Sequence, residues 1–194
     1  MTRLHCLLLS LALAGMPPGV VLAQATPQQA TENAMRAMRG EAGLPALAAH
    51  IHAEELARFR DLLLPAMAPP VDAPAAAHQV AQLMRRDVFG PDIGAGQLQQ
   101  MDPTAFMRGF LAANQRQMRE AGVQFGEWEV IGLLAEDELM HAVVRSRTRS
   151  GNAAPVAMLE VVSLRRDDGQ WKLLLSPELE GAARMLRAQL PGLD

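Results

Sequence analysis

The chain has 194 residues, a formal net charge of −3 at pH 7 and one cysteine, Cys6. A weakly acidic chain has no electrostatic attraction for the phosphate backbone, so we predict no nucleic-acid partner. The absence of tyrosine excludes tyrosine general acids. Because Cys6 is the sole cysteine, the chain after it has no disulfides and no cysteine zinc ligands.

Residues 1–23 have the pattern of a secretory signal peptide. Arg3 provides the basic start, and the apolar run that follows is interrupted by Pro17-Pro18 before it reaches the about 20 residues that a membrane span needs. A small residue precedes the predicted cut after Ala23, and a cut after Ala25 fits equally well. We therefore expect an exported protein without a stable membrane anchor.

The expected destination is the periplasm. The basic residues are nearly all arginine, with Lys172 as the sole lysine, and the chain is rich in alanine and proline. This composition is typical of a GC-rich bacterial genome. Met16 stands where a lipoprotein carries its lipidated cysteine, so we expect no lipid anchor.

The first part of the mature chain is predicted to be helical. Residues 24–34 are polar and predict a flexible leader, followed by a single domain over residues 35–194. Within residues 35–121, apolar residues recur at helical spacing over residues 46–67 and 75–89, with charged residues between them.

A glycine-rich loop is expected over residues 90–101. Asp102-Pro103 then provides an N-cap and a first-turn proline for a further helix, and Gly122 provides its C-terminal stop.

The residue pattern changes to that of strands after Gly122. Residues 123–176 are predicted to form a four-stranded antiparallel meander, and Ser176-Pro177 to begin a last helix over residues 177–190. The strands are expected over residues 123–134, 139–149, 156–166 and 170–175. Helices followed by an antiparallel meander predict an α+β fold with the helices packed on the sheet.

The element order and the last hairpin resemble the NTF2-like (SnoaL-like) superfamily. The hairpin spans residues 161–173 and has the turn Asp167-Asp168-Gly169 followed by Trp171. The resemblance covers about residues 75–176. The resemblance implies a cone-shaped domain in which N-terminal helices cover a curved sheet. Enzymes of the superfamily use an acid or a histidine inside this cone.

Polar side chains gather on two of the predicted strands. Alternation places His141, Arg145 and Arg147 on one face of the second strand. Glu160 of the third strand shares its face with apolar residues, where a carboxylate without a partner is costly. One strand register sets Glu160 opposite Arg145, and a register one residue away sets it beside Val144.

These residues have two interpretations. In the first, they form a pocket with Glu160 or His141 as a general base, and Arg145, Arg147 and Trp128 bind the ligand. In the second, an arginine and Glu160 form a structural cross-strand pair. No metal site is predicted, because His50 and His52 would point to opposite sides of a helix. No cofactor motif is present either.

We therefore expect a non-catalytic domain that binds a small apolar ligand or a periplasmic protein through the concave face of its sheet. One alternative is an isomerase or dehydratase of the NTF2-like type that uses Glu160 or His141 as its base. Another is an interaction module that docks through its N-terminal helices, for which exposed leucine and phenylalanine side chains over residues 46–67 are the requirement.

Overall fold

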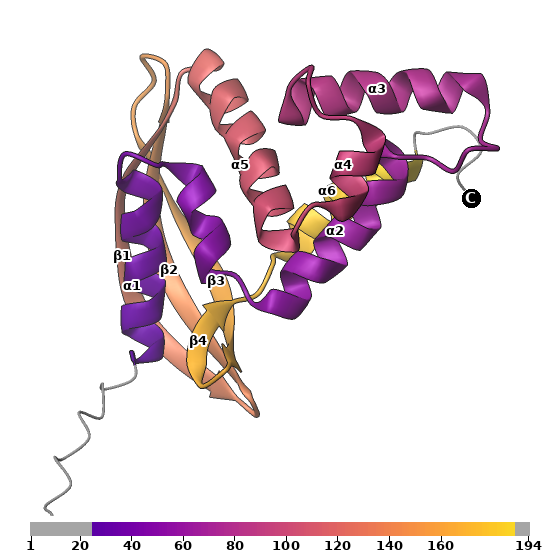
Figure 1. Cartoon of the computed structure of the whole chain (residues 1–194). Helices are drawn as coiled ribbons and strands as arrows, with labels where there is room; N and C mark the ends of the chain where they lie inside the picture. The colour runs from indigo at the N-terminus through magenta and orange to yellow at the C-terminus, as the bar shows by residue number, and fades with distance from the viewer. Residues whose placement is uncertain (1–24, 189–194) are drawn as a thin grey trace, which may run out of the picture.

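The computed structural model describes residues 25–188 (Figure 1). The predicted signal peptide, residues 1–23, and the predicted cut after Ala23 lie outside the described residues. The elements in chain order are α1 (Pro27–Arg39), the 3-10 helix η1 (Leu44–His50), α2 (Ala53–Met67), α3 (Ala75–Phe89), α4 (Ala95–Gln100), α5 (Pro103–Glu120), β1 (Val123–Glu136), β2 (Leu139–Ser150), β3 (Val156–Asp167), β4 (Gln170–Leu173) and α6 (Pro177–Ala188). None of the helices described is long and apolar enough to cross a membrane.

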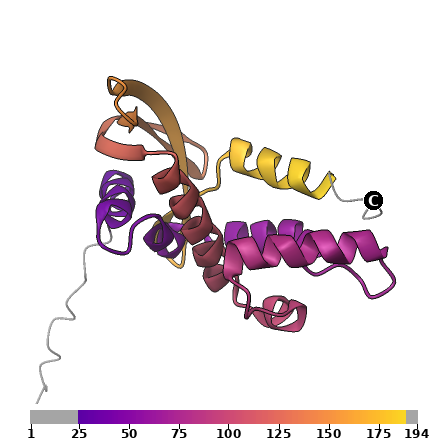
Figure 2. The ribbon, with the colours of Figure 1, turned by 90° about the horizontal axis from the view of Figure 1, so that it is seen from above.

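The predicted α+β fold is confirmed. The four strands form one open antiparallel sheet in the order β1-β2-β3-β4. Helices α1 and η1 lie over one face of this sheet, and α5 runs beside them (Figure 1). Seen from above, the sheet curves, and α2, α3, α4 and α6 extend away from it (Figure 2). We call the face under α1 and η1 the covered face and the opposite one the open face.

Two apolar cores hold these layers together. The first lies among the helices, where Phe59, Leu63, Phe106 and Met107 are at most 1% exposed. The second lies between α1 and the covered face and contains Ala34 together with residues from β2, β3 and β4, namely Ala142, Val144, Leu164 and Leu173. Burial of both apolar sets provides the main free energy that holds the helices to the sheet.

Helix α1 begins earlier than the sequence predicts. Thr26 and Gln29 form a capping box, in which the Gln29 N–H donates to Thr26 Oγ1 (3.2 Å) and the Thr26 N–H donates to Gln29 Oε1 (2.9 Å). Pro27 occupies the first helical position, which its missing N–H suits. Thr31 and Ala34 are fully buried. The predicted flexible leader over residues 24–34 is therefore wrong from Pro27 onward.

The helix predicted over residues 46–67 is interrupted. Ile51 forms a parallel bridge with Leu173, and the His52 N–H donates to the Leu173 carbonyl oxygen (2.9 Å). This contact with β4 holds Ile51 extended, so the chain divides into η1 and α2. Pro65 lies inside α2, which continues to Met67. A tertiary contact thus overrides local helical periodicity.

The connection to β1 is mostly as predicted. Asp102 Oδ1 accepts hydrogen bonds from the Thr104 and Ala105 N–H groups at the start of α5 (2.8 and 3.1 Å). Gly122 follows α5 with φ at 68°, a conformation that favours glycine. The loop expected over residues 90–101 contains α4, because Leu98 is fully buried in the helical core.

Candidate functional site

An apolar cavity of about 260 Å³ lies on the covered face of the sheet. Its walls come from α1, η1, three of the strands and the start of α6. Met35 and Met38 line it from α1, Leu47 from η1 and Leu179 from α6. The sheet side includes Trp128 and Glu160. The cavity is therefore built from segments far apart in the chain.

Among the side chains that the structure describes, Glu160 is the one charged residue that lines this cavity. The register of β2 and β3 pairs Glu160 with Val144 and pairs Arg145 with Leu159. Of the two registers that the sequence permits, the structure has the one that separates Glu160 from Arg145. Ser146, which is fully buried, donates its hydroxyl hydrogen to Glu160 Oε1 (2.7 Å). A half-buried carboxylate thus lies among apolar side chains with a neutral partner.

Trp128 forms the boundary between this cavity and a second hollow. The second hollow, of about 440 Å³, lies between α1 and the first two strands and is lined by Trp128, Met35, Arg36 and Glu129, among others. Shifts in the β1–β2 register on both sides of Trp128 pair this residue with Ser146. The indole N–H is buried and has no hydrogen-bond partner among the described residues.

An unpaired buried donor costs about 1–3 kcal/mol. Because the nitrogen itself is buried, this cost belongs to the packing of the indole against the sheet.

The remaining candidate residues lie on the open face. His141 Nδ1 is 2.8 Å from Ser163 Oγ, and His141 Nε2 is 2.7 Å from Glu136 Oε2. These three groups form a row across the strands, with the Glu136 side chain 67% exposed. The structure therefore separates His141 from Glu160, and the two do not share one pocket.

The two arginines are also on the open face. Arg145 pairs with Glu129 and Arg147 pairs with Glu127, each at 3.4 Å. Both pairs are exposed, so each contributes no more than about 1 kcal/mol. Arg145 and Arg147 do not line the apolar cavity, and the interpretation that joined them with Glu160 in one ligand pocket is not supported. Of the predicted ligand-binding residues, only Trp128 adjoins Glu160's cavity.

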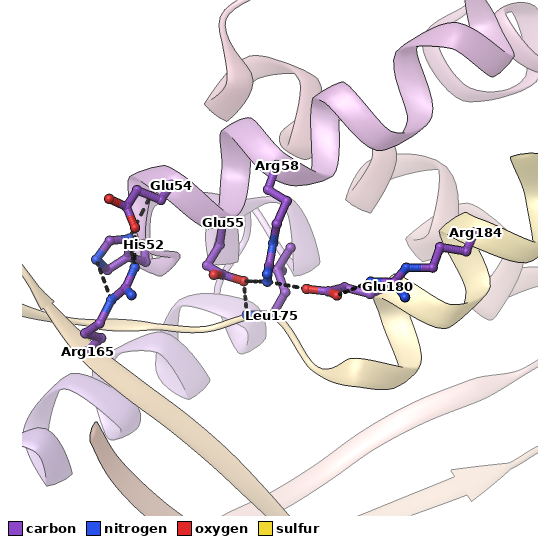
Figure 3. A network of polar contacts seen from close by, with 8 residues as sticks. All are labelled: His52, Glu54, Glu55, Arg58, Arg165, Leu175, Glu180 and Arg184. Atoms are coloured by element: carbon purple, nitrogen blue, oxygen red, sulfur yellow. Dashed lines mark hydrogen bonds and ion pairs between the residues drawn. The ribbon is translucent and has the colours of Figure 1, made fainter. Parts of the chain in front are cut away.

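A polar network fixes the cavity wall formed by the start of α6 (Figure 3). Glu55 is buried; it accepts from Arg58 (2.5 Å) and from the Leu175 N–H (3.4 Å). Arg58 also pairs with Glu180 of α6, and Glu180 accepts from Arg184 (3.5 Å). The network therefore holds α6 and Leu175, which lines the cavity, against α2.

The histidines near η1 have structural roles. His52 caps α2, since its Nδ1 accepts from the Glu54 N–H (3.3 Å), and its ring contacts Arg165, which also pairs with Glu54 (Figure 3). Burial, followed by the nearby Lys172 ammonium, lowers the pKa of the His50 imidazole. No group of three metal-ligating side chains is found within residues 25–188.

Sequence reasoning missed several residues of the cavity. Met35 and Leu47 lie in segments whose packing onto the sheet no local pattern indicates. Ser146 does not line the cavity but is the hydrogen-bond partner of Glu160. It could have been found, because it follows Val144 at strand spacing and so shares the covered face.

Comparison of the chain with family models, with curated proteins and with solved structures finds no match. The cavity with Glu160 and Trp128 is therefore interpreted from its own chemistry.

Proposed function

We propose that the protein is a non-catalytic binding domain that holds a small, mainly apolar ligand in the cavity on the covered face of its sheet. The single observation that carries this proposal is a cavity of about 260 Å³ with apolar lining and one carboxylate. Ligand sites are typically concave and mostly apolar, with a few polar groups that orient the ligand.

The size of the cavity limits the ligand. A water molecule occupies about 30 Å³ of liquid, so the cavity has room for roughly nine such units. This corresponds to a ligand of about eight to ten non-hydrogen atoms. The best small ligands reach about −1.5 kcal/mol per non-hydrogen atom, and most reach far less. A micromolar dissociation constant, about −8 kcal/mol, is thus within reach.

The proposed location is the periplasm, supported by the signal-like residues 1–23. A ligand-binding domain that lacks cysteine suits such an oxidising compartment. The interaction module loses its main support, because Leu56, Phe59 and Leu63 of the 46–67 segment are buried.

The test is a titration that follows Trp128 fluorescence in a Trp171→Phe background, since the chain has two tryptophans. Val162 lines the cavity, and Val162→Phe should fill it and abolish binding. Leu159→Phe is the matched control, because Leu159 lies on the same strand and is 65% exposed. Equal binding by both variants would contradict the proposal.

A second candidate function is proton transfer by Glu160. A carboxylate in an apolar cavity is suited to act as a general base, and Glu160 has this setting. The two functions differ in one measurement. If Glu160→Gln abolishes turnover of a carbonyl substrate while leaving its affinity unchanged, the domain is an isomerase-type enzyme. If bound compounds are recovered unchanged, it is a binding domain.

A further inference from the structure

We propose that the ligand carries a protonated amine, which binds Glu160, on an apolar body of about eight to ten non-hydrogen atoms. This inference rests on the proposed function, since it assigns the charge of the ligand that the same cavity takes. It is drawn from the charges that line the cavity and from the hydrogen bonds of Glu160.

Within the described part of the chain, the cavity contains a carboxylate and no cation. No arginine, lysine or histidine is among the lining residues that the structure describes. Arg145 and Arg147, which flank Ser146 on β2, lie on the open face and pair with Glu129 and Glu127. Among the described residues, the Ser146 hydroxyl provides the one hydrogen bond that Glu160 receives. The carboxylate therefore retains capacity to accept further hydrogen bonds.

This arrangement selects among ligands of equal size. An ammonium group donates charge-assisted hydrogen bonds to a carboxylate, which are stronger than those of a neutral donor. An anionic ligand such as a fatty acid would bring a second negative charge next to Glu160, where low dielectric strengthens the repulsion. An alcohol supplies a neutral donor only. The expected order of affinity is therefore amine, alcohol, carboxylate.

The wall beside Glu160 supports the same choice. Trp128 lines the same cavity, and the indole face is the aromatic surface that attracts cations most strongly. The thioethers of Met35 and Met38 add polarisable contacts around an alkyl chain. A carboxylate, an indole and apolar side chains together form a site suited to a hydrophobic ammonium ion.

The experiment measures the binding of octylamine, octanol and octanoate to the wild-type protein by calorimetry at one pH near 7. We expect octylamine to bind at least tenfold more tightly than octanol, and octanoate to show no binding. In Glu160→Gln, which preserves the shape of the side chain, the affinities for octylamine and octanol should converge to within about threefold. Glu127→Gln removes a carboxylate that is 82% exposed and pairs with Arg147, and it should leave the tenfold preference intact.

Two controls separate the cavity from the acidic surface. Val162→Phe should abolish octylamine binding, whereas amines held by surface carboxylates would still bind. Raising the salt concentration should weaken surface binding far more than binding at a half-buried carboxylate. The wild-type ranking stands alone as a test if Glu160→Gln fails to fold.

The outcomes distinguish the two proposals. If none of the three compounds binds, the proposed function is contradicted. If octanol or octanoate binds as tightly as octylamine, or if the amine preference persists in Glu160→Gln, the binding function stands and the assignment of a cationic ligand is overturned.

Discussion

A pair of leucines on β3 tests which face of the sheet is covered. Leu164 is fully buried against Ala34, Ala142 and Leu173, whereas Leu159, five residues earlier, is 65% exposed on the open face. Each is replaced by alanine. The two substitutions remove the same atoms from the same strand, so their difference reports only the surroundings of the side chain.

The expected magnitudes follow from burial. Fully buried leucines cost about 3–5 kcal/mol when replaced by alanine, because a cavity remains. We expect about 3 kcal/mol for Leu164→Ala. For a domain of this length, 1 kcal/mol corresponds to roughly 2–4 °C in Tm, so Tm should fall by about 6–12 °C. Leu159→Ala should lie within about 0.5 kcal/mol of the parent.

The assay is urea unfolding of both variants, followed by circular dichroism, with the slope of the transition as a check on two-state behaviour. A one-residue slip of β3 would exchange the two faces. If Leu159→Ala cost as much as Leu164→Ala, the covered face would be misassigned, and Glu160 would not line the cavity.

Three further predictions concern the surroundings of the cavity. Thr26→Ala removes the N-cap of α1 and should lower the free energy of unfolding by about 1 kcal/mol. Gln28→Ala, on the same exposed turn, should change the free energy of unfolding by less than about 0.5 kcal/mol. Equal effects of the two substitutions would show that the capping box does not form. Glu55→Ala leaves the partly buried Leu175 N–H without its partner and should cost about 1–3 kcal/mol in urea unfolding. Arg184→Ala, with a side chain 71% exposed, should cost almost nothing. A costly Arg184→Ala together with a neutral Glu55→Ala would contradict the network of Figure 3. Burial and Lys172 lower the pKa of His50 below its ordinary value of 6.5, so the folded state binds this proton less readily than the unfolded chain. The stability that neutral His50 allows is complete above pH 6.5 and decreases as the pH falls through this value. His50→Gln should therefore reduce the loss of Tm on acidification. An unchanged pH profile of Tm would refute the lowered pKa.

The sheet could be predicted from the sequence because its signals are local. Alternation in β2 places Ala142 and Val144 on the face opposite Arg145, and both are fully buried. The turn at Asp167-Asp168-Gly169 sets the last hairpin, and Gly169 has φ at 78°. These features depend on neighbouring residues, which a sequence displays directly.

The cavity could not be predicted because its walls depend on contacts between distant segments. The bridge between Ile51 and Leu173 divides the expected long helix, and no pattern around Ile51 indicates it. The β2–β3 register places Glu160 opposite Val144, although alternation alone also permits Arg145. The capping box at Thr26 extends α1 into a polar segment that resembles a leader. Each of these contacts forms one part of the covered face.

The most direct test of ligand binding in the cavity follows the two indole N–H signals by nuclear magnetic resonance during titration with octylamine. Trp128 lines the cavity and Trp171 does not. Binding as described here should shift the Trp128 signal until it saturates, leave the Trp171 signal in place, and have no effect in Val162→Phe. An unchanged Trp128 signal, or equal shifts of both indoles that persist in Val162→Phe, would contradict ligand binding in the cavity.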